Sequence, residues 1–338
     1  MTAPDVLVEG LSVSYAAATS RHQALNDVSV EIAAGEVVAV VGESGSGKST
    51  LALAVGGLLR RPPALVESGT VLVGGHDLYG MSKQQLQHIR GRQIAMIFQD
   101  ARASLNPMMR VGRQVGAAFK IHQGLSGKEL AQATLRSLES VGIADAEDRL
   151  HAFPHELSGG MCQRVMIAIA LACRPKTLLA DEPTAALDVT VGNQILRLVM
   201  DQVRQRGMSL LLVTHNLGQA AFLADRIVVL YAGQVVEIGS PKELLTNPKM
   251  PYTAALFGAI PSVNGSRLAR LPTIVSRSSA SPSESGCWYR GYCSIADTAC
   301  ETGSIELIDV GENHVSRCLY PDRVIPQIDV SYRTLGAQ

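Results

Sequence analysis

The chain has 338 residues, enough for one large domain and a smaller one. Hydrophobic residues make up 46% and charged residues 18%, which is typical of a globular protein with a sizeable core. Lys plus Arg equals Asp plus Glu, at 30 each, so the zero net charge indicates no overall attraction to nucleic acid. The N-terminus does not resemble a secretory signal, and the longest apolar run, at 165–173, is too short to cross a bilayer. We therefore expect a cytosolic protein that reaches a membrane only through partners.

The first third of the chain predicts an antiparallel sheet followed by a strand, a loop and a helix. Apolar and polar residues alternate over 6–32, a period of two that is typical of strands. The apolar run 37–41 predicts a strand buried on both faces, and a helical pattern over 49–59 follows a Gly/Ser loop. This order of strand, glycine loop and helix is the opening of a βα unit.

Helical patterns dominate from about 83 to 173, where Ser126 and Glu129 predict a capping box at one helix start. Strands are predicted at 177–180 and 209–214, with a helix over 191–206 between them. Strands that alternate with helices indicate a largely parallel sheet.

The character of the chain changes near residue 245. Four prolines punctuate residues 248–272, and the serine-rich segment 276–285 is typical of a linker. We therefore predict one domain over 1–245 and a C-terminal extension over 246–338.

The glycine loop fits the pattern G-x-x-x-x-G-K-[ST] at every fixed position, with Gly42, Glu43, Ser44, Gly45, Ser46, Gly47, Lys48, Ser49 and Thr50. Glycines let backbone N–H groups wrap around phosphate oxygens, and the following helix adds its positive N-terminal end. Lys48 is expected to reach the β- and γ-phosphates, and the Ser49 hydroxyl to ligate Mg²⁺. The alternative is a chance glycine turn, which the preceding strand and following helix argue against. The loop therefore predicts an MgATP site.

Polar residues follow two of the predicted strands. Asp181 would hold Mg²⁺, and Glu182 would orient or deprotonate the attacking water. The alternative is a helix cap with an acidic first turn. His215 ends the neighbouring strand, where open sheets place their sites, although a lone His is more often structural. Tyr15 could stack on adenine, with a core tyrosine as the alternative.

A second glycine-bearing helix start resembles the signature motif of ABC transporter ATPases, and comprises Leu157, Ser158, Gly159, Gly160, Met161, Cys162, Gln163 and Arg164. The resemblance implies a P-loop NTPase of the ABC type, in which this motif covers the nucleotide held by a partner subunit. Such a fold has a mixed α/β sheet core, an antiparallel β subdomain and a helical subdomain, here about 100–160. It implies adenine stacking by Tyr15, a switch role for His215, and Gln99 as a Mg²⁺ ligand beside Ser49 and Asp181. The loop after the catalytic carboxylate corresponds to Ala186, Leu187 and Asp188.

Segments 99–107, 161–168, 181–191 and the tail from Pro248 resemble the oligopeptide/dipeptide/nickel import group. Ala101 and Ala185 depart from that group's pattern at positions without a catalytic role. The resemblance implies an ATPase for peptide or small-solute import on the cytoplasmic face of the membrane. Its partners would be a second ATPase subunit in a heterodimer, two membrane permease subunits and an extracytoplasmic solute-binding protein.

Two other classes of protein remain as alternatives. A soluble ABC ATPase that acts on nucleic acid or ribosomes would need a long coiled coil or a second cassette, and the chain has neither pattern. A P-loop kinase would have no reason to carry the signature motif.

Four cysteines lie within 32 residues of the tail, with the spacing C-x5-C-x6-C-x17-C, at Cys287, Cys293, Cys300 and Cys318. In a cytosolic protein such a cluster favours metal over disulfides. The spacing lacks the close pairs of zinc knuckles, so a [4Fe–4S] cluster is favoured, with zinc or no metal as alternatives. The resemblance points the same way, because some members of the peptide-import group bind such a cluster. The extension is therefore predicted to bind metal.

Overall fold

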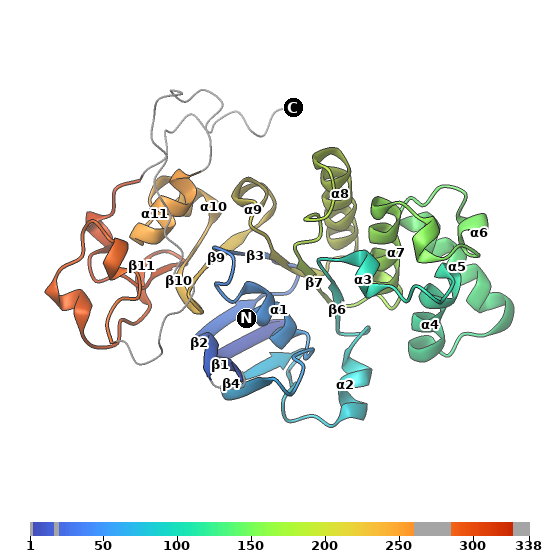
Figure 1. The fold of residues 1–338 in the computed structure, drawn as a ribbon, viewed down its shortest axis with the longest axis horizontal. Coiled ribbons are helices and arrows are strands. Elements are labelled where there is room, and N and C mark those ends of the chain that lie inside the picture. Colours follow the sequence, from blue (N-terminus) through green and yellow to red (C-terminus); the bar gives the residue numbers. More distant parts are fainter. Residues whose placement is uncertain (1–2, 17–19, 260–284, 327–338) are drawn as a thin grey trace.

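The computed structural model describes residues 3–16, 20–259 and 285–326 (Figure 1). The predicted serine linker at 276–285 lies outside the described residues, except for its last residue. The strands, in chain order, are β1 (Val6–Ala16), β2 (Arg21–Ile32), β3 (Val37–Val41), β4 (Ala64–Val73), β5 (His76–Asp77), β6 (Ile94–Ile97), β7 (Thr177–Asp181), β8 (Ser209–Val213), β9 (Arg226–Tyr231), β10 (Gln234–Gly239), β11 (Ile308–Gly311) and β12 (His314–Ser316). The α-helices are α1 (Lys48–Val55), α2 (Lys83–Ile89), α3 (Ala101–Ser104), α4 (Val111–Gln123), α5 (Gly127–Ser140), α6 (Ala146–Arg149), α7 (Gly159–Leu171), α8 (Val189–Arg206), α9 (Leu217–Leu223), α10 (Pro241–Thr246) and α11 (Pro251–Gly258).

An eight-stranded mixed sheet forms the centre, in the order β11-β12-β10-β9-β3-β8-β7-β6. β3 pairs in parallel with β8 and β9, and β7 pairs in parallel with β6 and β8. Every residue of β3, β7 and β8 is buried, as the continuous apolar runs predict for strands covered on both faces. The carboxyl ends of β3, β7 and β8 therefore lie together at one edge, where a site is expected.

A second, antiparallel sheet has the order β2-β1-β4-β5, and it lies at the bottom of Figure 1. β1 pairs antiparallel with both β2 and β4, which agrees with the alternating pattern over 6–32. The buried side chains of β1, β2 and β4 pack with α1 and one face of the central sheet in one core cluster. Two sheets and α1 thus enclose the start of the glycine loop.

Helices α3 to α6 form the helical part predicted over about 100–160, and they lie to the right in Figure 1 beside α7 and α8. Leu138 of α5 is fully buried in the core cluster that α7 and α8 share with the other face of the central sheet. The capping box predicted at the start of α5 is wrong. Ser126 is the N-cap but its side chain makes no capping hydrogen bond, and Gly127 has a φ of +54°, outside the helical range. The backbone of Gly127, and not a side-chain cap, therefore sets the start of α5.

The described part of the C-terminal extension packs against the central sheet. β12 pairs antiparallel with β10, so β11 and β12 continue the sheet beyond residue 245. Glu237 of β10 and His314 of β12 are both buried, and Glu237 Oε1 lies 2.7 Å from His314 Nε2. The Glu237 carboxylate also accepts hydrogen bonds from the backbone N–H groups of Lys249 and Met250, at 2.6 and 3.1 Å. Three polar groups from two other segments of the chain therefore meet at the buried carboxylate of β10.

Candidate nucleotide site

The glycine loop connects β3 to α1, and its backbone adopts conformations at the glycine positions that other residues rarely adopt. Gly47 has a φ of +102°, and a Cβ there would lie 2.5 Å from the Ala24 carbonyl oxygen. Gly45 has a φ of +81° and no atom within 4 Å of the position of a Cβ, so its backbone faces open space. Gly47 is the N-cap of α1 and supplies no side-chain cap, so the first N–H groups of the helix are left for a ligand. Such a cradle fits phosphate oxygens.

Two polar atoms of the loop support the same fit. Ser46 Oγ and Glu43 Oε1 are buried, and neither has a hydrogen-bond partner among the described residues. Buried polar atoms are nearly always paired in native proteins, and phosphate oxygens would pair with the Ser46 hydroxyl. Ser44 and Thr50 occupy the loop and the first turn of α1, as the motif predicts. The loop therefore fits a nucleotide.

Lys48 is almost fully buried and points back into the loop. Its Nζ donates hydrogen bonds to the carbonyl oxygens of Gly42 and Glu43, at 2.8 and 2.7 Å. Burial lowers the pKa of Lys48, while Glu182, Asp181 and Glu43 act in the opposite direction. A desolvated ammonium ringed by carboxylates is poised to exchange these carbonyls for phosphate oxygens, which carry more charge.

The predicted Mg²⁺ residues meet at the end of β7. Ser49 Oγ donates a hydrogen bond to Asp181 Oδ1 at 3.1 Å. Asp181 is buried, and burial is the main cause of its raised pKa, which the Ser49 hydrogen bond partly offsets. A divalent cation would stabilise this carboxylate in its ionised form, so the pair fits Mg²⁺.

The three predicted hydrolysis residues meet next to this pair. Gln99 Nε2 donates to Glu182 Oε2 at 3.0 Å, and His215 Nδ1 lies 3.3 Å from the same oxygen. The register of β7 and β8 pairs Asp181 with Val213, which brings these side chains to one edge. Glu182 has a φ of +45°, a strained conformation for a residue that is not glycine, and such strain is found at functional sites. Glu182 therefore does not belong to a helix cap, and the cap of the following helix is Asp188.

The signature residues form the start of α7, away from α1 in Figure 1. Ser158 is the N-cap, and its Oγ accepts a hydrogen bond from the Met161 N–H at 3.2 Å. Leu157 and Gln163 are buried, and the ideal Cβ positions of Gly159 and Gly160 face Leu187 and Val191. Ala186, Leu187 and Asp188 thus lie beside the signature motif of the same chain.

Tyr15 lies near the end of β1, with its hydroxyl 3.4 Å from the Thr50 hydroxyl in α1. Its half-buried ring is next to the glycine loop, where an adenine ring could reach it.

A contact of the glycine loop was missed by sequence reasoning. The Glu43 N–H donates a hydrogen bond to the Tyr252 hydroxyl at 3.1 Å, between residues 209 positions apart. Tyr252 stands in a segment that the resemblance picked out, Pro251-Tyr252-Thr253, but no sequence pattern connects it to the loop.

The four tail cysteines lie around one small cavity, which Met250, Pro251, Ile295 and Tyr320 also line. Burial raises the pKa of Cys287, Cys293 and Cys318, the last to about 11, so these thiols are protonated at neutral pH. Within the described ranges, no three His, Cys, Asp or Glu side chains are placed to hold a metal ion. The expectation of a metal-binding extension is therefore not supported, because the thiols surround the cavity without converging on one point.

Comparison with known proteins agrees with the geometry of the nucleotide site. The fold and the site define a P-loop ATPase of the ABC class. Residues 25–185 match the ABC transporter family, and residues 236–300 match the C-terminal region of oligopeptide/dipeptide transporters. The chain belongs to the ABC transporter family, in the group that carries this C-terminal region, and it is an ATP-hydrolysing enzyme.

Among curated relatives, the chain is 41% identical to a putative peptide import ATP-binding protein of Brucella abortus (strain 2308), over 94% of this chain and 97% of the relative. It is 42% identical to the dipeptide transport ATP-binding protein DppD of Escherichia coli (strain K12), over 93% and 96%. A solved dimer of the ATP-binding cassette MJ0796, bound to ADP and Pi, is 30% identical with a TM-score of 0.63. That match covers 70% of this chain and 98% of the other.

Proposed function

We propose that the protein is the ATP-hydrolysing subunit of a membrane importer for peptides or a related small solute. One observation supports it above all: Ser49, Asp181, Gln99, Glu182 and His215 converge beside the glycine loop in a chain whose full-length relatives are named for peptide import. The alternative, a soluble ABC ATPase that acts on nucleic acid or ribosomes, is disfavoured, because proteins of that class would not carry the oligopeptide/dipeptide C-terminal region.

In this proposal the loop residues and Lys48 bind the phosphates, while Ser49, Asp181 and Gln99 hold Mg²⁺. The metal would neutralise charge on the phosphates. Glu182 accepts a proton from the attacking water, and His215 and Gln99 keep its carboxylate oriented through Oε2. Tyr15 stacks on adenine.

A second ATPase subunit, in a heterodimer, would complete the site through its signature motif. An open cleft of about 560 Å³ lies at the edge of the hydrolysis residues and is lined by Glu182, Asp188, His215 and Phe222. Phe222 and Val189 on its rim are 70% and 80% exposed, which is unusual for large apolar side chains. The cleft and its apolar rim therefore support a protein partner here.

The helical part supports contact with two membrane permease subunits. A mostly apolar groove of about 210 Å³ separates it from the core, with Phe98, Ala118 and Ile169 in its walls. Two large apolar side chains of the helical part, Ile121 and Met108, are 73% and 86% exposed. No helix in the described ranges is long and apolar enough to cross a membrane. In this proposal the chain works at the cytoplasmic face as a peripheral subunit, with cargo delivered by an extracytoplasmic solute-binding protein.

Proteoliposomes that contain the assembled complex would test the proposal. A dipeptide together with the solute-binding protein is expected to stimulate ATP hydrolysis and to drive uptake of labelled dipeptide. Ile121→Asp should weaken assembly with the permeases, whereas Leu65→Asp, at another exposed apolar position on β4, should not. Stimulation by a nickel complex but by no peptide would overturn peptide import.

We also propose that the extension binds a [4Fe–4S] cluster through Cys287, Cys293, Cys300 and Cys318. The supporting observation is that all four thiols border one cavity. In a [4Fe–4S] cluster each cysteine binds a different iron, so the four cysteine sulfurs lie further apart than those around a single metal ion. This spacing fits four thiols that border one cavity but do not converge on one point. The cluster would supply a folding nucleus to a short segment.

Anaerobically purified full-length protein would then be brown and contain about four irons per chain. Cys300→Ser should bleach the absorption near 400 nm and a Cys173→Ser control should keep it. Both variants should still bind MgADP, with a Kd within about 10-fold of the wild type. Colourless protein with one zinc, or with no metal, would exclude the cluster.

A further inference from the structure

One tyrosine of the C-terminal region reaches the phosphate-binding loop. Tyr252, in the first turn of α11, is fully buried, and its hydroxyl accepts the hydrogen bond from the Glu43 N–H at 3.1 Å. Burial raises the pKa of Tyr252 well above its usual range, so the hydroxyl is neutral at physiological pH. A buried neutral hydroxyl is costly unless it is paired, and the loop supplies a hydrogen-bond partner.

The Tyr252 hydroxyl and Lys48 hold the two ends of one peptide group. The N–H of the Gly42–Glu43 peptide donates to Tyr252, and its carbonyl oxygen, on Gly42, accepts from Lys48 Nζ at 2.8 Å. Gly42 has a φ of +148°, and a Cβ there would lie 2.2 Å from the Leu230 carbonyl oxygen, so neighbouring backbone crowds this peptide. Rotation of the peptide plane would break both hydrogen bonds, which means that Tyr252 helps to set the place from which Lys48 reaches the phosphates.

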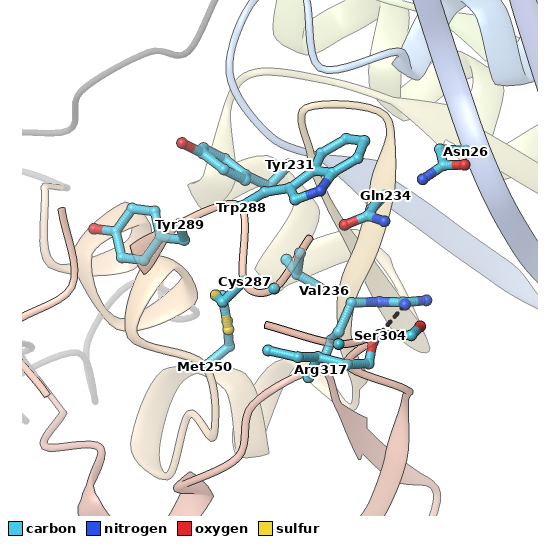
Figure 2. Close-up of a pocket in the computed structure, with 13 residues that line it drawn as sticks. Asn26, Tyr231, Gln234, Val236, Met250, Cys287, Trp288, Tyr289, Ser304 and Arg317 are labelled. Carbon is cyan, nitrogen blue, oxygen red and sulfur yellow. Dashed lines mark hydrogen bonds between the residues drawn. The ribbon is translucent and has the colours of Figure 1, made fainter. Parts of the chain in front are cut away.

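The Tyr252 ring is itself held by two other tyrosines. Its centroid lies 4.6 Å from that of Tyr231, at the end of β9, and 5.5 Å from that of Tyr289. Tyr231 and Tyr289 meet edge to face at 5.4 Å. Figure 2 shows Tyr231, Trp288 and Tyr289 gathered close to Cys287. Tyr289 therefore connects the segment that bears the cysteines to the residue that contacts the loop.

Core packing alone would need the three rings but not the hydroxyl of Tyr252, and it is this hydroxyl that contacts the loop.

We propose that Tyr252 is a positioning residue of the phosphate-binding loop, and that Tyr289 of the cysteine-bearing extension keeps it in place. The extension then sets how tightly the loop binds phosphates. The inference rests on the proposed nucleotide site and adds to it a residue that touches neither nucleotide nor Mg²⁺.

Tyr252→Phe removes the hydroxyl and keeps the ring. In the full-length protein, the Kd for MgADP measured by titration calorimetry is expected to rise about 2- to 10-fold, the usual effect of one neutral hydrogen bond. In this proposal the contact holds the loop equally before and during hydrolysis, so the KM for ATP should rise while kcat changes less than about twofold. Tyr292→Phe, the same change at a half-exposed ring of the extension, should leave the Kd unchanged.

A second variant tests the path through the extension. Tyr289→Leu keeps the Tyr252 hydroxyl but removes its support, so it should also raise the Kd for MgADP. The double variant Tyr252→Phe/Tyr289→Leu should then bind no more weakly than the weaker single variant, because both changes act on one contact. Fully additive effects would contradict the path through Tyr289.

The outcomes separate this inference from the proposed function. If the wild-type chain bound no MgADP, the nucleotide site itself would be wrong. If the wild type bound and Tyr252→Phe bound equally well while its melting temperature fell, Tyr252 would be a packing residue only, and the inference would fail.

Discussion

The hydrolysis site makes its sharpest prediction at Glu182. Glu182→Gln keeps the size of the side chain and one oxygen that can still accept from Gln99, but it removes the base. Loss of a general base costs about 10²- to 10⁴-fold in rate, which corresponds to about 2.7 to 5.4 kcal/mol on the barrier. We expect turnover to fall by at least about 10²-fold, because an amide held by Gln99 and His215 in the place of the carboxylate cannot accept the proton of the attacking water.

The assay is phosphate release at saturating MgATP by the assembled complex, with the Kd for MgADP measured in parallel. Binding should be retained, since Lys48, Ser49 and Asp181 are untouched. The control is Glu31→Gln, an exposed carboxylate on β2, which should keep full turnover. Turnover within about threefold of the wild type in Glu182→Gln would remove Glu182 from the mechanism.

Three further predictions concern other parts of the chain. Ser158→Arg should abolish ATP hydrolysis by the assembled complex and leave the Kd for MgADP of the isolated chain unchanged, because in the proposed dimer the signature acts on the partner's nucleotide. Full, concentration-independent hydrolysis by an isolated monomer would refute this. Gly47→Ala should lower the free energy of unfolding by roughly 1–3 kcal/mol in a urea titration, since its φ of +102° and the Ala24 carbonyl leave no room for a Cβ, whereas Gly124→Ala, at a φ of +71° in open space, should cost less. Burial lowers the pKa of His122, and the charges of Arg92 and His88 lower it further, so the stability that neutral His122 contributes is present above pH 6.5 and is lost as the pH falls through the lowered pKa. The melting temperature of His122→Gln should therefore fall less than that of the wild type between pH 7 and pH 5. Equal falls would contradict this.

Sequence patterns predicted the parts of the fold that local chemistry controls. β3 has the predicted bounds, 37–41, because a run of five apolar residues favours a strand buried on both faces. The helix α8 begins within two residues of its predicted start. The ends of predicted strands identified Glu182 and His215, and the resemblance to ABC ATPases identified Gln99; the structure brings the three side chains together. The sequence did not predict β4, β5 or β9 to β12, and it did not predict β6, whose four residues are too short to show a period.

Contacts between residues far apart in the chain could not be predicted from the sequence. The Tyr252 contact joins positions 209 residues apart, and nothing local distinguishes its hydroxyl from that of an ordinary core tyrosine. The capping box at Ser126 failed for the opposite reason. The right residue types are present, but the positive φ of Gly127 carries the backbone away from the geometry that a cap needs.

The pairing of β10 with β12 limits how far the ATPase can be shortened. A chain cut near residue 245 would expose the backbone of β10 as a free sheet edge, which invites pairing between molecules. It would also remove His314 and the N–H groups of Lys249 and Met250, the partners that hold the Glu237 carboxylate at this edge. A chain that ends near residue 245 is therefore expected to aggregate. The C-terminal extension covers the edge of the central sheet at β10 and so keeps it from pairing with another molecule.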